Sequence, residues 1–289
     1  MLTLPSGSSR ADASHAQLAS YYDRHAALID GTVFGWDGAA HPRRLRGGIL
    51  QVAVSRDAWY GVTSAGELSR WSAPEPAAAV VLRRGVARVA AGASGWIALD
   101  RAGSAWQAGS NDVAVRVMAD VLDAAVGDSA DYLVTRDGRV HVRGLAHRGQ
   151  YGDGLLRATP DYVATATDAV AVRAHTGHAV LLRRDGTVMG TGGNRFGPLS
   201  AHGLGDKADR WGPIFQEAVA IATGSRHTLA LRADGSLWAW GEGFAVEPAK
   251  VMDRVRAVAA GDTATIALGE DGALWQWDGG GRPRRLAWP

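Results

Sequence analysis

The 289-residue sequence contains no cysteine and no uninterrupted run of 18 apolar residues. The absence of cysteine excludes disulfides, thiol catalysis and thiolate metal ligands, and the absence of a long apolar run argues against a transmembrane helix. The first residues, MLTLPSGSSRADASHA, lack the basic start and apolar core of a secretory signal. We therefore expect a cytoplasmic protein of bacterial type, with delivery as a secreted effector as the open alternative. Residues 1–15 are expected to form a disordered or loosely attached tail.

The sequence also has little excess charge, with 31 basic and 29 acidic residues and a formal net charge of +2. Its arginine pairs are scattered along the chain, whereas a nucleic-acid-binding protein needs a concentrated basic face. No phosphate loop, nucleophile elbow or dinucleotide fingerprint is present. We therefore expect no nucleic-acid partner, no membrane partner and no cofactor.

Glycine is abundant, with 38 residues, and seven glycines recur at intervals of 35 to 49 residues. These glycines are Gly31, Gly66, Gly103, Gly138, Gly186, Gly235 and Gly272. Five of them follow Asp, and an Asp-Gly pair between two apolar runs is a strong hairpin signal. A strand of small residues precedes most hairpins, and a short segment with Pro or Arg follows. Each repeat therefore predicts four antiparallel strands.

Seven such repeats predict an all-β fold, a seven-bladed β-propeller of four-stranded antiparallel blades, in a single domain over 16–289. The expected blades are 16–46, 49–83, 86–117, 121–165, 168–217, 218–252 and 255–288. A β-solenoid is the alternative for a repeating all-β chain, but its coils are shorter and parallel.

The repeats carry a family resemblance. The sixth contains GSRHTLALRADGSLWAWGEG, the seventh AAGDTATIALGEDGALWQWDGG, and the fourth keeps the loop HRGQYGDG. These segments resemble the repeat of the regulator of chromosome condensation family, and the resemblance extends over roughly 16–288. It implies the propeller fold, and function must still be argued from a site. The compact repeats also resemble propeller-type β-lactamase inhibitory proteins, which implies a role as a pure protein binder.

Tryptophan and histidine recur at fixed places in the repeats. Trp lies five residues after the turn glycine in four repeats and three residues after it in three, so these rings are expected to fill the gaps between blades. The resemblance implies that His25, His178 and His227 hydrogen-bond the backbone of a neighbouring blade. His175 and His178 fall short of the ligand number that zinc needs, so no metal is predicted.

The topology separates two faces. The loops between the first and second strands and between the third and fourth strands of each blade lie on one face, called the loop face here; the Gly turns and the links between blades lie on the other, the turn face. Blades 4 and 5 carry extra residues in 144–160 and 190–213, which should form a ridge on the loop face. Because Trp, Tyr and Arg are frequent interface anchors, we predict a partner-binding set on this face. It comprises Tyr21, Tyr22, Arg24, Arg56, Asp57, Trp59, Trp96, Asp128, His147, Arg148, Tyr151, His175, Arg195, Phe196, Trp211, Arg226 and Asp262.

The sequence therefore predicts a non-enzymatic protein–protein interaction module, acting as a scaffold or inhibitor, with no catalytic residues assigned. Two alternatives stay open. One is a guanine-nucleotide-exchange-type effector that acts on a small GTPase, as the family resemblance suggests. The other is an enzyme with a small-molecule site in the central mouth, where Asp57, Asp128, Asp131 and Asp262 could supply acid and base.

Overall fold

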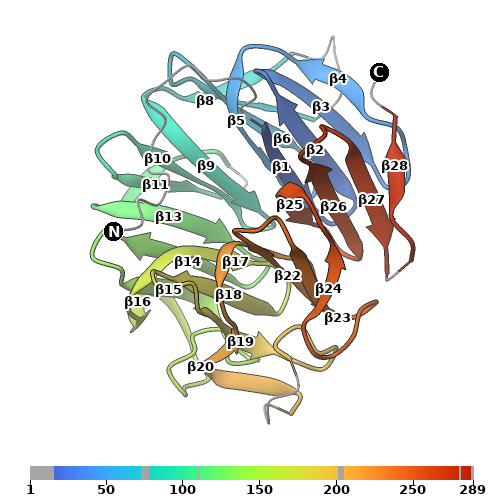
Figure 1. Cartoon of the computed structure of the whole chain (residues 1–289). Coiled ribbons are helices and arrows are strands. Elements are labelled where there is room, and N and C mark those ends of the chain that lie inside the picture. The colour runs from blue at the N-terminus through green and yellow to red at the C-terminus, as the bar shows by residue number, and fades with distance from the viewer. Residues whose placement is uncertain (1–15, 73–77, 110, 201–204, 280, 288–289) are drawn as a thin grey trace.

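The computed structural model describes residues 16–72, 78–109, 111–200, 205–279 and 281–287. Over these residues, 28 strands form seven four-stranded antiparallel sheets, which are arranged as blades around a central axis (Figure 1). The predicted seven-bladed β-propeller is thus confirmed. The tail predicted for residues 1–15 lies outside the described residues. Within them, no helix is long and apolar enough to cross a membrane.

Each blade is one continuous segment of chain, and its strands run in order from the axis outward. Blade 1 has β1 (Ala16–Tyr21), β2 (Arg24–Ile29), β3 (Thr32–Asp37) and β4 (Arg43–Arg46). Blade 2 has β5 (Ile49–Val54), β6 (Trp59–Thr63), β7 (Leu68–Trp71) and β8 (Val80–Arg83). Blade 3 has β9 (Val86–Gly92), β10 (Gly95–Asp100), β11 (Ala105–Ala108) and β12 (Val115–Met118). Blade 4 has β13 (Val121–Val126), β14 (Ala130–Thr135), β15 (Val140–Leu145) and β16 (Ala158–Ala166). Blade 5 has β17 (Ala169–Ala174), β18 (His178–Arg183), β19 (Val188–Gly193) and β20 (Lys207–Phe215). Blade 6 has β21 (Ala218–Thr223), β22 (His227–Arg232), β23 (Leu237–Gly241) and β24 (Ala249–Met252). Blade 7 has β25 (Val255–Ala260), β26 (Ala264–Gly269), β27 (Leu274–Asp278) and β28 (Arg284–Leu286).

The turn glycines connect the second and third strands of every blade, and all seven have φ between +77° and +86°. Only glycine adopts this region readily, so these positions fix the hairpins. Blade 1 differs in having a two-residue turn, in which Asp30 also has a positive φ of 47°. In blades 2 to 7 the turn is one residue longer; in blade 2, for example, the Thr63 amide donates to the Glu67 carbonyl at 3.0 Å.

The ring closes by side-chain packing between blades 1 and 7, and the two blades share no sheet. Leu18, Ala27 and Trp36 of blade 1 form one buried cluster with residues of β26 and β27. The Trp36 indole nitrogen donates to Oε1 of Gln276 at 2.8 Å, and Nε2 of Gln276 donates to the Gly38 carbonyl at 3.0 Å. The seam therefore depends on apolar contacts and a few hydrogen bonds, which include one between backbones, from the Asp262 amide to the Tyr22 carbonyl at 3.0 Å.

The expected tryptophan packing is present. The four rings five residues after the turn glycine are each at most 4% exposed: Trp36, Trp71, Trp240 and Trp277. The rings three residues after the glycine are only partly buried, and two lie beneath a guanidinium: Arg83 is 3.5 Å from the Trp106 ring centroid and Arg232 is 4.7 Å from that of Trp238. The first set fills the gaps between blades.

The histidine expectation needs correction. Nε2 of His178 lies 3.1 Å from the Thr228 hydroxyl, and Nε2 of His227 lies 3.1 Å from the Thr265 hydroxyl. Each ring thus bonds a threonine side chain of the next blade and not its backbone. In the strand pairing of blade 1, His25 lies opposite Trp36, one position nearer the turn than His178 and His227 lie in their own blades. It bonds Ser20 of its own blade at 2.8 Å. The shorter hairpin of blade 1 accounts for this displacement.

Candidate functional site

Two tyrosines of blade 1 close the central mouth on the loop face. The hydroxyl of Tyr22 donates to Oδ2 of Asp128 in blade 4 at 2.5 Å, and the hydroxyl of Tyr21 donates to the other oxygen of the same carboxylate. The Tyr21 oxygen also accepts from the Ala93 amide at 3.0 Å. These bonds join blades 1, 3 and 4 across the ring.

His175 completes this closure. Its ring stacks on Tyr21 with centroids 4.5 Å apart, and its Nδ1 lies 3.0 Å from the Thr176 hydroxyl and 3.1 Å from the Ser225 hydroxyl. Burial lowers the pKa of His175 to about 4, so the ring is neutral near pH 7. Burial, followed by the Asp128 carboxylate, raises the pKa of Tyr21. Tyr21, Tyr22, Asp128 and His175 are called the mouth cluster below.

Two of the four carboxylates considered for acid–base chemistry, Asp128 and Asp131, are already engaged in hydrogen bonds. Asp128 accepts hydrogen bonds from two tyrosine hydroxyls, as described above. Asp131 is 6% exposed and accepts from Ser94 at 2.9 Å and from Gln107 at 2.5 Å. Burial raises the pKa of Asp131. These contacts hold blades 3 and 4 together. Across the described residues, no group of three or more potential ligands could hold a metal ion.

The predicted ridge is present, with a different internal structure. The segments 144–160 and 190–213 include parts of β16 and β20, which are nine-residue strands, so much of the extra length is outer strand and not loop. Residues 146–157 lie against blade 5: the Gly154 amide donates to Asp209 at 2.7 Å, and the Trp211 amide donates to Gly152 at 3.1 Å. Such hydrogen bonds make the ridge an ordered surface.

The second loop of the ridge is anchored in the same way. The Pro198 carbonyl accepts from the Thr228 hydroxyl at 2.7 Å and from the Trp240 indole at 2.8 Å. Asn194 holds the loop from within, because its Nδ2 donates to the Ser200 carbonyl at 2.9 Å and its Oδ1 accepts from Leu199 at 2.8 Å. Blades 4, 5 and 6 are therefore joined continuously on the loop face.

An exposed aromatic and basic surface lies on this anchored loop. Phe196 is 39% exposed, and the guanidinium of Arg226 lies 4.7 Å from its ring centroid, while that of Arg195 lies 5.8 Å away. Arg226 also pairs with Glu242 at 2.9 Å. Val246, which is 51% exposed, lies against Gly197. Arg195, Phe196, Arg226 and Val246 form what we call the ridge surface.

Arg148 extends this surface toward blade 4. It is exposed, and its side chain lies over Gly177 and Gly193, where the absence of a Cβ leaves room for it. His147 beside it is also exposed. The sequence prediction named these basic residues and Phe196 but missed Val246, whose apolar character in an outer loop was the available signal.

Three predicted anchors are buried, which corrects their expected exposure. Trp59 and Trp96 are each 1% exposed and Tyr151 is 0% exposed. The Trp59 indole donates to the His25 carbonyl at 3.1 Å, and the Tyr151 hydroxyl donates to the Gly144 carbonyl at 3.1 Å. These side chains face the adjacent blade or their own loop. They therefore stabilise the fold and offer no surface to a partner in this conformation.

The rest of the predicted set has three placements: around the mouth, buried within it, and packed against Tyr132. Tyr22, Arg24, Arg56, Asp57 and Asp262 surround the mouth, where Arg56 lies 4.3 Å from the Tyr22 ring centroid and Arg24 pairs with Asp37 at 3.0 Å. Tyr21 and His175 are buried within the mouth cluster. Trp211 is half-buried against Tyr132. The structure thus concentrates the exposed members at the mouth rim and on the ridge, and their role in binding stays a prediction.

The seven blades, built from repeats and closed into a ring, define this protein as a seven-bladed β-propeller. Residues 218–244, which form most of blade 6, match the Regulator of chromosome condensation (RCC1) repeat. The resemblance that the sequence suggested is therefore confirmed.

Similar proteins include the ultraviolet-B receptor UVR8 of Arabidopsis thaliana, with 29% identity over 120 residues (38% of this chain). The secretion-regulating guanine nucleotide exchange factor of Bos taurus is 31% identical over 128 residues (41% of this chain). The matched segments span 27% of the length of each of these two proteins. Both relatives are eukaryotic, and the bacterial source stays a prediction.

Two solved structures show the same fold. Prp20p of Saccharomyces cerevisiae superposes with a TM-score of 0.71 at 15% identity, covering 84% of this chain and 80% of Prp20p. Human WBSCR16 superposes with a TM-score of 0.61 at 16% identity, covering 97% of this chain and 83% of that protein. At these identities the likeness concerns the fold alone.

Proposed function

We propose that the protein is a non-enzymatic protein-binding module that contacts its partner through the ridge surface of blades 4 to 6. The observation that carries the proposal is the exposed Phe196 ring flanked by Arg195 and Arg226 on a loop that is hydrogen-bonded to the next blade. Interfaces are enriched in aromatic residues and Arg, and a rigid backbone reduces the entropy lost on binding.

The charge of the ridge favours an acidic partner. Arg148 and Arg195 are exposed and cationic. Among the ridge contacts described above, the ion pair with an acidic residue is that of Arg226 with Glu242. Such a patch steers an acidic surface during encounter. The solved neighbours support protein binding in general: one is described by its binding to Gsp1p and histones, and yeast RCC1 has been crystallised with Kap60.

Replacing Phe196 by Ala should weaken partner binding at least tenfold, because a central aromatic anchor contributes about 2 kcal/mol or more. The partner is first captured from the source lysate, identified by mass spectrometry and purified, and its affinity is then measured by calorimetry. Val115 is also apolar and is 56% exposed, and it lies on the outer strand of blade 3. Val115→Ala is therefore the matched control and should bind the partner as the wild type does. Both variants should melt as the wild type does. Unchanged affinity for both Phe196→Ala and Arg195→Glu would remove the ridge from the proposal.

A second candidate is nucleotide exchange on a small GTPase, favoured by the 31% identity to a guanine nucleotide exchange factor. The protein should then accelerate release of a fluorescent GDP analogue from one member of a GTPase panel at least tenfold, and Phe196→Ala should abolish the acceleration if exchange uses the ridge. Release at the intrinsic rate from every GTPase, together with binding of a different partner, would exclude exchange and leave the binding module in place.

A further inference from the structure

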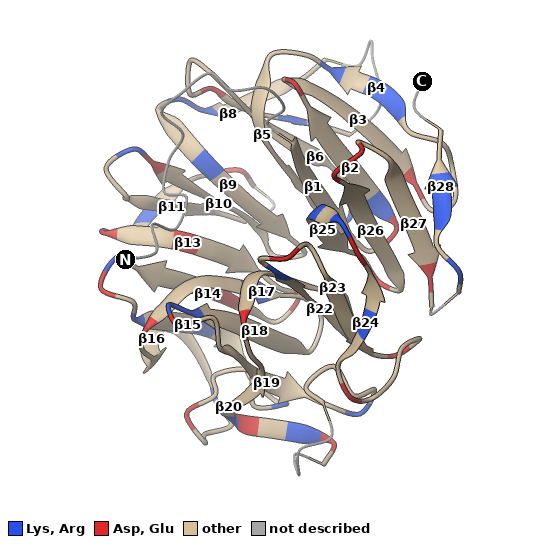
Figure 2. Ribbon diagram, in the orientation of Figure 1, with Lys and Arg blue, Asp and Glu red and all other residues tan. Residues whose placement is uncertain are grey.

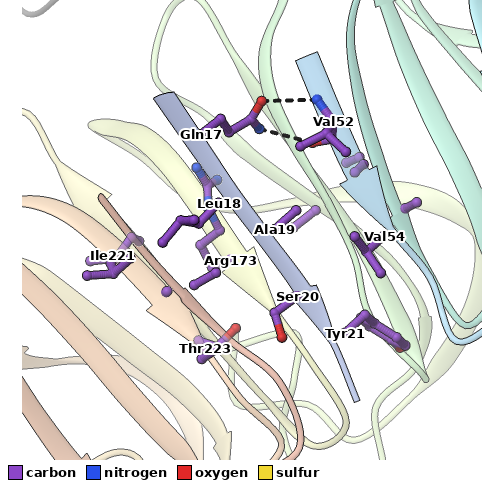
Figure 3. A pocket seen from close by; sticks show the side chains of 18 of the residues that line it. Gln17, Leu18, Ala19, Ser20, Tyr21, Val52, Val54, Arg173, Ile221 and Thr223 are labelled. Atoms are coloured by element: carbon purple, nitrogen blue, oxygen red, sulfur yellow. Dashed lines mark hydrogen bonds between the residues drawn. The ribbon is translucent and has the colours of Figure 1, made fainter. Parts of the chain in front are cut away.

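A cavity of about 400 Å³ runs along the axis of the ring, between the innermost strands of the blades (Figure 3). Tyr21 and His175 of the mouth cluster line it, so the cavity is closed toward the loop face. At the other end lie Leu50 and Val219, the second residues of β5 and β21, which are 53% and 48% exposed. Entry is therefore from the turn face, opposite the loop face.

Small residues leave this space open. Most of the lining side chains are Ala or Val, which suits strands that converge on one axis. Polar side chains bridge some of the blades: Oε1 of Gln17 accepts from the Val52 amide at 3.1 Å, and Oε1 of Gln51 accepts from the Val89 amide at 2.6 Å. The wall is thus fixed in shape around blades 1 to 3, and a site on it is preformed.

The charged residues of the wall make the cavity positive. They are Arg88, Asp123, Arg173 and Arg256, with a formal net charge of +2 (three positive minus one negative). Figure 2 shows that most other charges lie on outer strands and loops, such as β4, β20 and β28. A narrow opening with low-dielectric walls concentrates the field of such charges and raises the local concentration of anions.

His175 contributes a second feature at the closed end. Its Nε2 is buried and has no hydrogen-bond partner, and the residue is 4% exposed. Nδ1 of His175 lies 3.0 Å from the Thr176 hydroxyl and 3.1 Å from the Ser225 hydroxyl, and a hydroxyl can donate to Nδ1, so these contacts permit the tautomer that carries the ring proton on Nε2. A buried donor without an acceptor is costly, by about 1–3 kcal/mol.

Arg173 is the fifth residue of β17 (Ala169–Ala174), His175 follows the last residue of that strand, and both residues line the cavity. NH1 of Arg173 bonds Oδ2 of Asp123 at 2.8 Å, and the side chain keeps 42% exposure. The lining of the cavity therefore includes a guanidinium and, at its closed end, a ring nitrogen without a partner.

We propose that this cavity binds a small organic or inorganic anion with carboxylate or phosphate oxygens, which enters from the turn face and is held by Arg173 and by Nε2–H of His175. The volume lies within the range of small-molecule sites. The site is on the opposite side of the mouth cluster from the ridge surface, so it is independent of the protein-binding proposal.

The test uses the full chain at neutral pH and titrates succinate, its neutral isostere succinamide, and inorganic phosphate by calorimetry. Succinate, phosphate or both should bind, and succinamide should not. Arg173→Gln should weaken anion binding at least tenfold. Arg254→Gln removes a 76% exposed arginine on the turn face outside the cavity and should leave binding unchanged. Binding of succinate without phosphate, or the reverse, identifies the anion class.

A second measurement uses the wild-type protein, so a folding defect in a variant cannot affect it. In protein labelled with ¹⁵N-histidine, the Nε2 resonance of His175 should shift on addition of the bound anion, while that of His147, an exposed residue on the loop face, should stay in place. The proposal is overturned if neither anion binds at millimolar concentration, if succinamide binds equally well, or if the His175 resonance stays fixed while binding occurs.

Discussion

Acidification from pH 7 to pH 5 should lower the free energy of unfolding by about 6–8 kcal/mol, which is comparable with the whole stability of many domains. The cause is four buried histidines. Burial lowers the pKa of His25, His175 and His227 to about 4 and that of His178 to about 3. In the unfolded chain each ring has a pKa of about 6.5.

The direction follows from proton uptake. Below pH of about 6.5 the unfolded chain binds protons that the folded chain rejects until its own lower pKa values are reached. Stability is therefore complete above this pH and is lost as the pH falls toward 4, by about 2 kcal/mol for each ring at pH 5. Burial is the largest cause of the lowered pKa of His178 and of His227, whose Nε2 atoms lie beside neutral threonine hydroxyls, and the Asp262 carboxylate offsets only part of this effect at His227.

Urea unfolding, followed by tryptophan fluorescence at pH 7 and pH 5, measures this loss. His227→Gln should reduce the difference in unfolding free energy between pH 7 and pH 5 by about 2 kcal/mol, because the variant lacks one ring that is protonated at pH 5 only in the unfolded chain. His147→Gln, at an exposed position, should leave the difference unchanged. Equal stability at pH 7 and pH 5 would contradict the prediction. A loss of stability confined to pH values below 4 would indicate that carboxylates titrate and not these histidines.

The sequence was sufficient for the architecture because its signals are local. The turn glycines need a positive φ whatever surrounds them, and all seven have it. The rings five residues further on, such as Trp240, recur at a fixed distance and pack between blades. Blade boundaries predicted from these two signals agree with the strands to within one or two residues; for example, blade 6 was expected over 218–252 and runs from Ala218 to Met252.

The site was only partly predictable because it depends on contacts between blades. Trp59 and Tyr151 were expected on the surface, since alternation along one strand does not show which side the next blade will cover. The closure of the mouth joins Tyr21 to Asp128, which are 107 positions apart in the chain. No local pattern indicates that pair, whereas the exposed Phe196 was found through the extra length of its loop.

Trp36→Ala should lower the free energy of unfolding by about 3–5 kcal/mol, among the largest effects of any single substitution in this chain. Trp36 is 1% exposed and lies in the seam between blades 1 and 7, where it also donates to Gln276. Trp106→Ala, at a half-buried ring of blade 3, is expected to lower the free energy of unfolding by only about 1–2 kcal/mol, because folding removes less apolar area from water at this ring.

The location of the damage distinguishes the seam from ordinary core packing. Because blades 1 and 7 are not consecutive in the chain, whereas every other pair of neighbouring blades is joined by a short link, weakening the seam should open the ring between β1 and β25, and amide hydrogen exchange should accelerate there first. Trp240→Ala is the matched control: the ring is equally buried but lies between blades 5 and 6, so it should destabilise similarly and leave β1 and β25 as protected as their neighbours. Uniform loss of protection around the ring in Trp36→Ala would mean that the seam is no weaker than the other blade contacts. Early exchange confined to β1 and β25 would instead establish side-chain packing as the element that holds the circle closed.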